Sequence, residues 1–210
     1  EENLPWLQSL QICKNGVPSH DTYYKLFRSL NSKVFEERFI EWTRHIADKI
    51  PSVIAIDGKS INAARDGLYA PIHLISAFCV ENQLVFGSTQ AKGGIKGELK
   101  GIKALLQILD VKGMTVTIDA GGCYRVIAEA IQASGGDYVF TVKKNQRYLF
   151  EELEKFFLEK KNDLEKHDGS YWYSEEKGHG RLEKREVWTC GDLKNLSKKD
   201  EWPGLQSIAC

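Results

Sequence analysis

Two aspartates stand in matching surroundings, each directly after a short apolar run. Asp57 follows residues 53–56, Asp119 follows residues 116–118, and glycine comes soon after each aspartate. Runs of this kind, rich in β-branched residues and closed by glycine, are typical of buried strands in a sheet covered on both faces. Each run is therefore predicted to be a strand that brings one carboxylate to the sheet edge where α/β proteins bind ligands.

Two carboxylates on neighbouring strands are suited to Mg²⁺ or Mn²⁺, because these hard cations prefer oxygen ligands. Two such ions about 4 Å apart activate the attacking oxygen and stabilise the leaving oxygen in phosphodiester chemistry. The alternative is that Asp57 and Asp119 only begin turns, since Asp-Gly and Asp-Ala-Gly are good turn sequences. The matching contexts favour a metal site.

Composition limits the classes of protein to consider. The chain has 210 residues with 42% hydrophobic residues, enough for one large domain or a core domain with an appendage. The net charge is zero, so the whole-chain charge does not indicate a polyanion partner, although local patches matter more. Five scattered cysteines without a C-x-x-C pair indicate reduced thiols in a cytoplasmic protein. No apolar stretch is long enough for a bilayer, so no membrane association is expected.

The elements that must position the aspartates follow a distinctive order. An antiparallel run of three strands is expected first, and two strand–helix crossovers then complete one mixed sheet. This is the order of a ribonuclease-H-like core, an α/β fold in which the first and fourth strands are adjacent, so Asp57 and Asp119 are expected to be neighbours. The expected strands are residues 53–56, 73–80, 84–88, 116–118 and 138–142, with helices at 99–109 and 124–134.

Three regions are predicted: an N-terminal helical segment at 1–50, the ribonuclease-H-like catalytic core at 51–146, and an incomplete β-rich insertion at 147–210. In the first region Ser19 is the expected N-cap of a helix. The helices there are expected to pack on the core rather than to read DNA as a helix-turn-helix. In the third region a helix precedes a hairpin, whose strands at 171–174 and 187–189 flank a glycine-rich turn at 177–180.

Basic side chains cluster at three places and are predicted to contact DNA phosphates, with Trp172 and Tyr173 available to stack on bases. The alternative is a solvated surface in which glutamates of the hairpin pair with these cations, and both interpretations stay open. The predicted DNA contacts are Lys59, Lys143, Lys144, Asn145, His179, Arg181 and Arg185.

The motifs in combination resemble the ISAs1-type (IS4-like) DDE transposases, including the H-repeat-associated proteins. Residues 16–22 and the helices after them also resemble the N-terminal domain of that family. The motifs that carry the resemblance are Ile54-Ala-Ile-Asp-Gly-Lys59, Thr117-Ile-Asp-Ala-Gly-Gly-Cys123, Gly135-Gly-Asp-Tyr-Val139, Lys143-Lys-Asn-Gln146 and Lys177-Gly-His-Gly-Arg-Leu-Glu-Lys-Arg185.

The resemblance implies a Mg²⁺- or Mn²⁺-dependent DDE site that nicks transposon ends and joins the freed 3′ hydroxyl to target DNA. Asp57 and Asp119 match the first two acids of that triad and its metal ligands. The third acid is expected on a helix beyond Cys210, so the chain is expected to be truncated at its C-terminus. Within the chain Glu183 is the first candidate for the third catalytic acid and Glu98 the second.

The resemblance also implies DNA as the partner, both as transposon ends and as target, and a homodimer in the intact transposase. Two other functions stay open at this stage. One is a catalytically inactive DNA-binding remnant of a transposase, in which the aspartates have no role. The other is a ribonuclease-H-like nuclease that acts on structured nucleic acid without recognising transposon ends.

Overall fold

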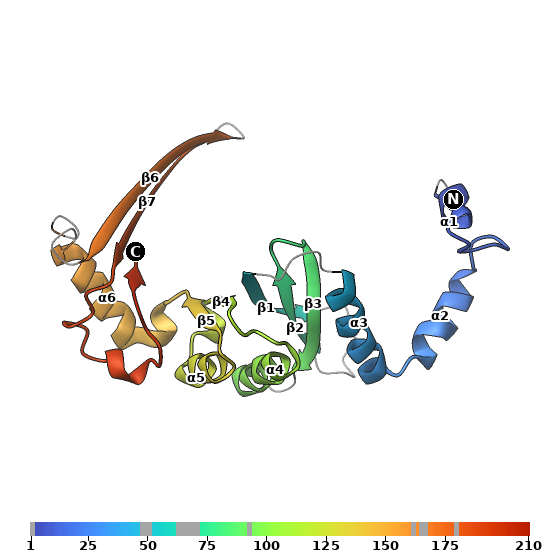
Figure 1. Ribbon diagram of the computed structural model, residues 1–210, viewed down its shortest axis with the longest axis horizontal. Helices are drawn as coiled ribbons and strands as arrows, with labels where there is room; N and C mark the ends of the chain where they lie inside the picture. The colour runs from blue at the N-terminus through green and yellow to red at the C-terminus, as the bar shows by residue number, and fades with distance from the viewer. Residues whose placement is uncertain are drawn as a thin grey trace. The chain divides into compact units, whose positions relative to one another are not determined.

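The computed structural model of the chain describes residues 3–46, 52–61, 72–91, 94–160, 163, 168–178 and 181–210. The chain divides into two compact units, Glu1–Trp42 and Thr43–Cys210 (Figure 1). The N-terminal elements are the helices α1 (Leu4–Ser9), α2 (His20–Ser29) and α3 (Ser32–Ile46), the last of which continues into the second unit. The predicted cap of α2 is confirmed, because the Ser19 hydroxyl accepts a hydrogen bond of 3.3 Å from the Thr22 amide.

The second unit contains the sheet predicted from the strand order. Its strands run β3-β2-β1-β4-β5, with β1–β2 and β2–β3 antiparallel and β1–β4 and β4–β5 parallel. The predicted ribonuclease-H-like arrangement, with the first and fourth strands adjacent, is thus confirmed. The strands are β1 (Val53–Ile61), β2 (Ile72–Cys79), β3 (Leu84–Ala91), β4 (Thr115–Ile118) and β5 (Asp137–Phe140).

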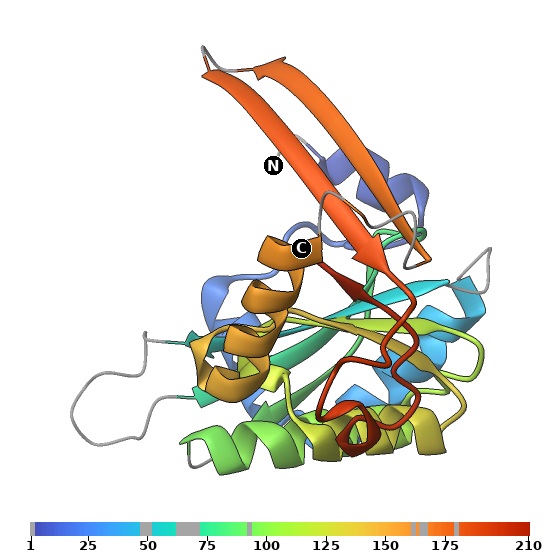
Figure 2. The same ribbon diagram turned by 90° about the vertical axis from the view of Figure 1, so that its left-hand side faces the viewer.

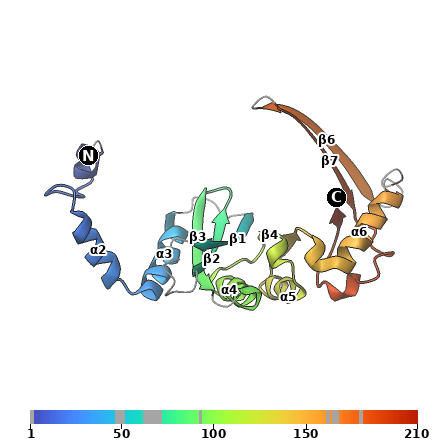
Figure 3. The same cartoon turned by 180° about the vertical axis from the view of Figure 1, so that it is seen from behind.

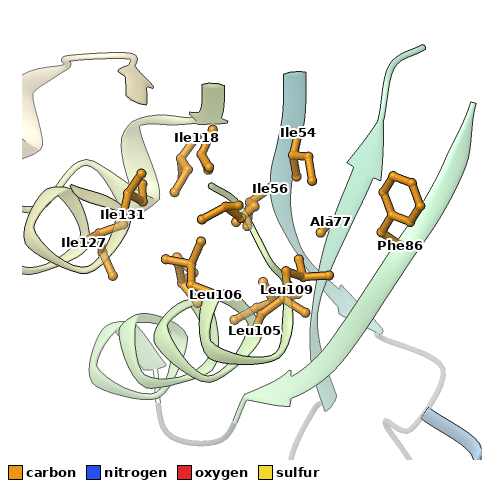
Figure 4. Packing of buried hydrophobic residues seen from close by; sticks show 14 of the residues in the cluster. Ile54, Ile56, Ala77, Phe86, Leu105, Leu106, Leu109, Ile118, Ile127 and Ile131 are labelled. Carbon is orange, nitrogen blue, oxygen red and sulfur yellow. The ribbon is translucent and has the colours of Figure 1, made fainter. Parts of the chain in front are cut away.

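Helices α4 (Gly94–Ile108) and α5 (Arg125–Ala133) cover one face of this sheet (Figures 2 and 4). Leu105 and Leu106 of α4 pack toward Ile54 and Ile56 of β1, and all four side chains are buried. Each such side chain stabilises the fold by about 1.5–3 kcal/mol relative to exposure. This core is what holds β1 and β4 in a fixed register.

A second layer follows β5. It contains α6 (Arg147–Lys160) and a three-stranded antiparallel sheet in the order β6-β7-β8 (Figure 3). A second hydrophobic cluster, with Phe157, Cys190 and Trp202 among its members, joins α6 and the base of this sheet to α5. The strands are β6 (Gly169–Gly178), β7 (Arg181–Cys190) and β8 (Ile208–Ala209), and the short 3₁₀ turns of the unit are η2 (Ala120–Gly122), η3 (Lys144–Gln146) and η5 (Lys199–Glu201).

The predicted strands are shorter by several residues than the observed β1, β3, β6 and β7. β1 continues past Asp57 to Ile61, because its antiparallel pairing with β2 extends beyond the end of its pairing with β4. The hairpin strands β6 and β7 have ten residues each, so Lys177 and Gly178 belong to β6 rather than to the predicted turn. Most hairpin side chains are exposed, and a strand without a buried face lacks the apolar alternation that sequence patterns detect.

Candidate active site

Asp57 and Asp119 stand at equivalent places on two adjacent parallel strands. In the β1–β4 ladder Ile56 pairs with Ile118, and the next residue on each strand is the aspartate. Figure 4 shows these two isoleucines on neighbouring strands above α4. The structure therefore brings both predicted carboxylates to the end of the same ladder.

Asp57 is open to solvent although its backbone is part of the sheet. Its side chain is 57% exposed, and the Lys59 ammonium lies 3.6 Å from its Oδ2 atom. Asp57 pairs across the sheet with Ser76 of β2, so the backbone around it is held on one side although the β4 ladder has ended. Lys59, predicted to contact DNA, is thus placed beside the first acid of the site.

Asp119 is fixed by the turn that follows it. Its Oδ1 atom accepts a hydrogen bond of 2.9 Å from the Gly121 amide and so caps η2. A Cβ atom on Gly122 would overlap Ile118, which explains why the turn needs glycine at that position. The carboxylate therefore depends on the exact shape of a tight backbone turn.

Glu98 of α4 reaches the same place from the helical layer. A Cβ atom on Gly58 would stand 2.8 Å from Glu98 Oε1, so the missing side chain makes room for this carboxylate. A Cβ atom on Gly121 would stand 3.6 Å from Glu98 Oε1 and 3.1 Å from Asp119 Oδ1. Glu98 is only 21% exposed, and its Oε1 lies 3.7 Å from Nε2 of His73. The second candidate for a third acid thus lies beside the segments of both aspartates.

Glu183, the first candidate, lies elsewhere. It belongs to β7 in the three-stranded sheet, pairs across the hairpin with Glu176, and forms an ion pair with Arg185. The hairpin extends away from α4 and α5 (Figures 1 and 2). The structure does not bring Glu183 to the two aspartates, and its catalytic role stays a prediction from sequence.

The predicted DNA contacts divide into two groups. Lys143 and Lys144 are exposed at the end of β5, whereas Asn145 directs its amide toward the backbone of the Asp119 turn. Arg181 and Arg185 lie on the exposed hairpin, where Arg185 pairs with glutamates. His179 lies outside the described residues.

Two side chains near the Asp119 turn, Cys123 and Tyr138, have raised pKa values. Burial raises the pKa of the Cys123 thiol to about 11, so the thiol stays protonated at neutral pH. Burial, and then the neighbouring Cys123, raises the pKa of Tyr138 to about 12. Cys123 therefore offers no thiolate at neutral pH, and the charged donors at the site are the carboxylate oxygens of Asp57, Asp119 and Glu98.

These oxygens are the donors that Mg²⁺ and Mn²⁺ prefer. In the described part of the chain no three His, Cys, Asp or Glu side chains lie close enough together to hold one ion. The carboxylate oxygens of Asp57, Asp119 and Glu98 are suitable ligands for a divalent cation. These side chains would have to rotate before they could bind one ion together. Among the described helices, none has the length and apolar character needed to span a membrane.

Comparison with known proteins assigns a family to this arrangement. Residues 48–196 match the family described as the transposase DDE domain. A protein of the dhlA 3′ region of Xanthobacter autotrophicus is 32% identical over 97% of this chain and 68% of its own length.

Two relatives from Escherichia coli (strain K12) are H repeat-associated proteins. YhhI is 40% identical over 99% of this chain, and the chain spans only 55% of the length of YhhI. YbfD is 43% identical over 88% of this chain and 73% of its own length. The resemblance to H-repeat-associated proteins is thus confirmed, and the chain belongs to the transposase DDE domain family.

Proposed function

We propose that this chain carries the catalytic core of a DNA transposase, which cuts DNA at insertion-sequence ends and transfers the freed 3′ hydroxyl to target DNA with Mg²⁺ or Mn²⁺. The observation that supports this most is the register that puts Asp57 and Asp119 one residue beyond a paired position of adjacent parallel strands. The family match over residues 48–196 supports the proposal that these two acids take part in DDE chemistry.

Asp57 and Asp119 would hold the cation, which supplies Lewis acidity at the phosphate and lowers the pKa of the attacking hydroxyl. The chain's own contribution is to position the two carboxylates. The β1–β4 ladder fixes the spacing of the two backbones, and the η2 turn fixes the direction of the Asp119 carboxylate. Lys59 is placed to attract a phosphate to the first acid.

Glu98 is the third carboxylate in this proposal, because it is the acid that α4 brings next to Gly58 and Gly121. A rotamer change of its long side chain would turn the carboxylate toward an ion bound by Asp119. Glu183 is the competing prediction, and acid-by-acid substitution separates the two. The acid that the resemblance implies beyond Cys210 is the third alternative for the same role.

DNA ends and target DNA are the proposed partners, and a homodimer is the proposed form of the intact transposase. The relatives are bacterial, and chromosomal DNA would be the substrate, so the proposed activity takes place in the cytoplasm.

A nicking assay on duplex DNA with an insertion-sequence end tests this proposal. Purified protein with Mg²⁺ or Mn²⁺ is expected to cut at the end, while Asp57→Asn and Asp119→Asn lose activity by about 10³-fold, since several kcal/mol of metal stabilisation disappear. Salt-dependent DNA binding without any metal-dependent cutting would support the inactive remnant instead. Cutting of branched or hybrid substrates without end specificity would support the ribonuclease-H-like nuclease.

A further inference from the structure

Residues 143–146 leave β5 beside the turn that carries Asp119. β4 and β5 are parallel neighbours in register, with Ile118 opposite Phe140, so both strands deliver their following segments to the same edge of the sheet. After β4 comes Asp119 with η2, and after β5 comes Lys143 with η3. The two segments are separated in sequence but adjacent in space.

Two side-chain amides connect them. Asn145 Nδ2 donates a hydrogen bond of 2.5 Å to the Ala120 carbonyl oxygen, and Gln146 Nε2 donates one of 2.8 Å to the Cys123 carbonyl oxygen. Both hydrogen bonds are partly buried, where an amide–carbonyl bond is stronger than in water. Ala120 and Cys123 are the residues on either side of the two glycines, so the amides hold the turn at both ends.

Two backbone hydrogen bonds inside the turn are longer than the two from the side-chain amides. They run from the Gly122 amide to Asp119 O at 3.1 Å and from the Cys123 amide to Ala120 O at 3.3 Å, which is long for an amide–carbonyl bond. Glycines at 121 and 122 add conformational freedom. A shift of this turn moves the Gly121 amide, and with it the Asp119 carboxylate that the amide fixes.

We propose that Asn145 and Gln146 are positioning residues that hold the Asp119 carboxylate in place for the metal ion, rather than DNA contacts. This inference rests on the proposed function, in which Asp119 binds the cation. Lys143 and Lys144 directly precede the two amides and are exposed, so the same segment presents positive charge to a phosphate next to the carboxylate that it positions. Residues that orient a metal ligand in this way change metal affinity by about 10- to 100-fold when they are removed.

The chain offers a matched control. Gln132 Nε2 donates a partly buried hydrogen bond of 3.0 Å to the Gly136 carbonyl oxygen, at the opposite end of α5 from Cys123. This bond has the same chemistry, a side-chain amide to a backbone carbonyl, but it closes the C-terminal end of the helix. Removal of either bond is expected to have a similar effect on stability, whereas of the two residues only Asn145 touches the Asp119 turn.

The experiment compares Asn145→Ala, Asn145→Asp and Asn145→Gln with Gln132→Ala. Titration calorimetry with Mn²⁺ measures metal affinity, and hydrogen exchange in metal-free buffer measures protection of the Gly122 and Cys123 amides. We expect Asn145→Ala and Asn145→Asp to lower Mn²⁺ affinity by about 10- to 100-fold and to speed exchange at these amides. Asn145→Gln keeps a donor amide and recovers part of the affinity, and Gln132→Ala leaves both readouts at the wild-type value.

Two results would overturn the inference. One is wild-type exchange at Gly122 and Cys123 in Asn145→Ala. The other is a fall in DNA affinity in Asn145→Ala with Mn²⁺ affinity unchanged, which would make Asn145 a DNA contact. If the wild-type protein binds no Mn²⁺, the proposed function fails, and the metal-free exchange data still decide whether the two amides hold the turn.

Discussion

The two sheets of this chain carry acids in different physical settings. In the five-stranded sheet, Ile54 and Ile56 are buried beneath α4, and the acid that follows them is held by strand pairing on β1. In the hairpin β6–β7 most side chains are exposed, and Glu183 is balanced by Arg185 beside it. Both acids lie on paired strands and are more than half exposed, so the difference is the buried core beneath the five-stranded sheet, which supports the backbone that carries Asp57. This difference agrees with the proposal of metal chemistry at the edge of the five-stranded sheet and of DNA contact at the hairpin.

The strongest test of this difference concerns stability. Ile131→Ala removes a fully buried side chain from the core beneath the five-stranded sheet and is expected to cost about 2–5 kcal/mol in unfolding free energy. Leu182→Ala trims a side chain that is 55% exposed on the hairpin and is expected to change it by no more than about 0.5 kcal/mol. Urea denaturation measures both, and equal losses would contradict the contrast between the sheets.

Metal affinity gives a second test of the difference between the two sheets. Glu98→Gln is expected to weaken Mn²⁺ binding about tenfold or more, because it removes a charged oxygen donor next to the Asp119 turn. Glu183→Gln is expected to leave the affinity within about twofold, since an exposed ion pair contributes little. Calorimetry of both variants at constant ionic strength gives the comparison. A larger loss of Mn²⁺ affinity for Glu183→Gln would support Glu183 of the hairpin as the third acid.

DNA binding provides a third, smaller effect. Replacing Lys143 and Lys144 by alanine is expected to reduce the slope of log affinity against log salt by about 1 for each phosphate that the protein no longer neutralises. Replacing Lys184 and Arg185 is expected to reduce the slope less, because Glu175 and Glu176 already pair with these cations. Fluorescence anisotropy on one duplex at several salt concentrations measures both slopes. A greater reduction of the slope when Lys184 and Arg185 are replaced would show that their ion pairs with glutamate break when DNA binds.

The smallest expected effect concerns pH and the start of β1. A hydrogen bond from the Ser52 hydroxyl, together with others from nearby backbone amides, lowers the pKa of Glu81 from 4.5 to about 2. Because the folded-state pKa is depressed, this carboxylate stabilises the fold above its unfolded pKa. The stabilisation is lost as pH falls from about 4.5 to about 2.

Glu81→Gln is therefore expected to lower stability at pH 7 by a small amount that disappears near pH 2. Urea midpoints of the wild type and the variant across this range provide the measurement. A constant difference at every pH would mean that the charge of Glu81 has no part in anchoring β1.

Much of the five-stranded sheet could be predicted from sequence because its signals are local. Apolar runs before Asp57 and Asp119 indicate strands, and the order of strands and helices places those two strands side by side. Ser19 also indicates where α2 begins, because serine is a preferred N-cap residue. These features depend on neighbours within a few residues or on chain topology.

The rest depends on contacts that sequence patterns do not contain. Glu98 reaches the site because α4 packs over Gly58, and the amide of the exposed Asn145 donates a hydrogen bond to the carbonyl oxygen of Ala120, 25 residues earlier. Lysines and asparagines beside a predicted active site look alike in sequence whether they face DNA or a backbone carbonyl. The length of the hairpin was missed for a related reason, since strands without a buried face carry no apolar alternation.

Paramagnetic broadening by Mn²⁺ tests most directly whether the metal site lies at the end of the β1–β4 ladder. In amide NMR spectra of the chain, substoichiometric Mn²⁺ is expected to broaden the signals of Gly58 and Gly121 first and to leave those of Glu176 and Glu183 sharp. Asp119→Asn is expected to abolish the effect at both glycines. Broadening centred on the hairpin, or broadening at the glycines that persists without the Asp119 carboxylate, would contradict the account.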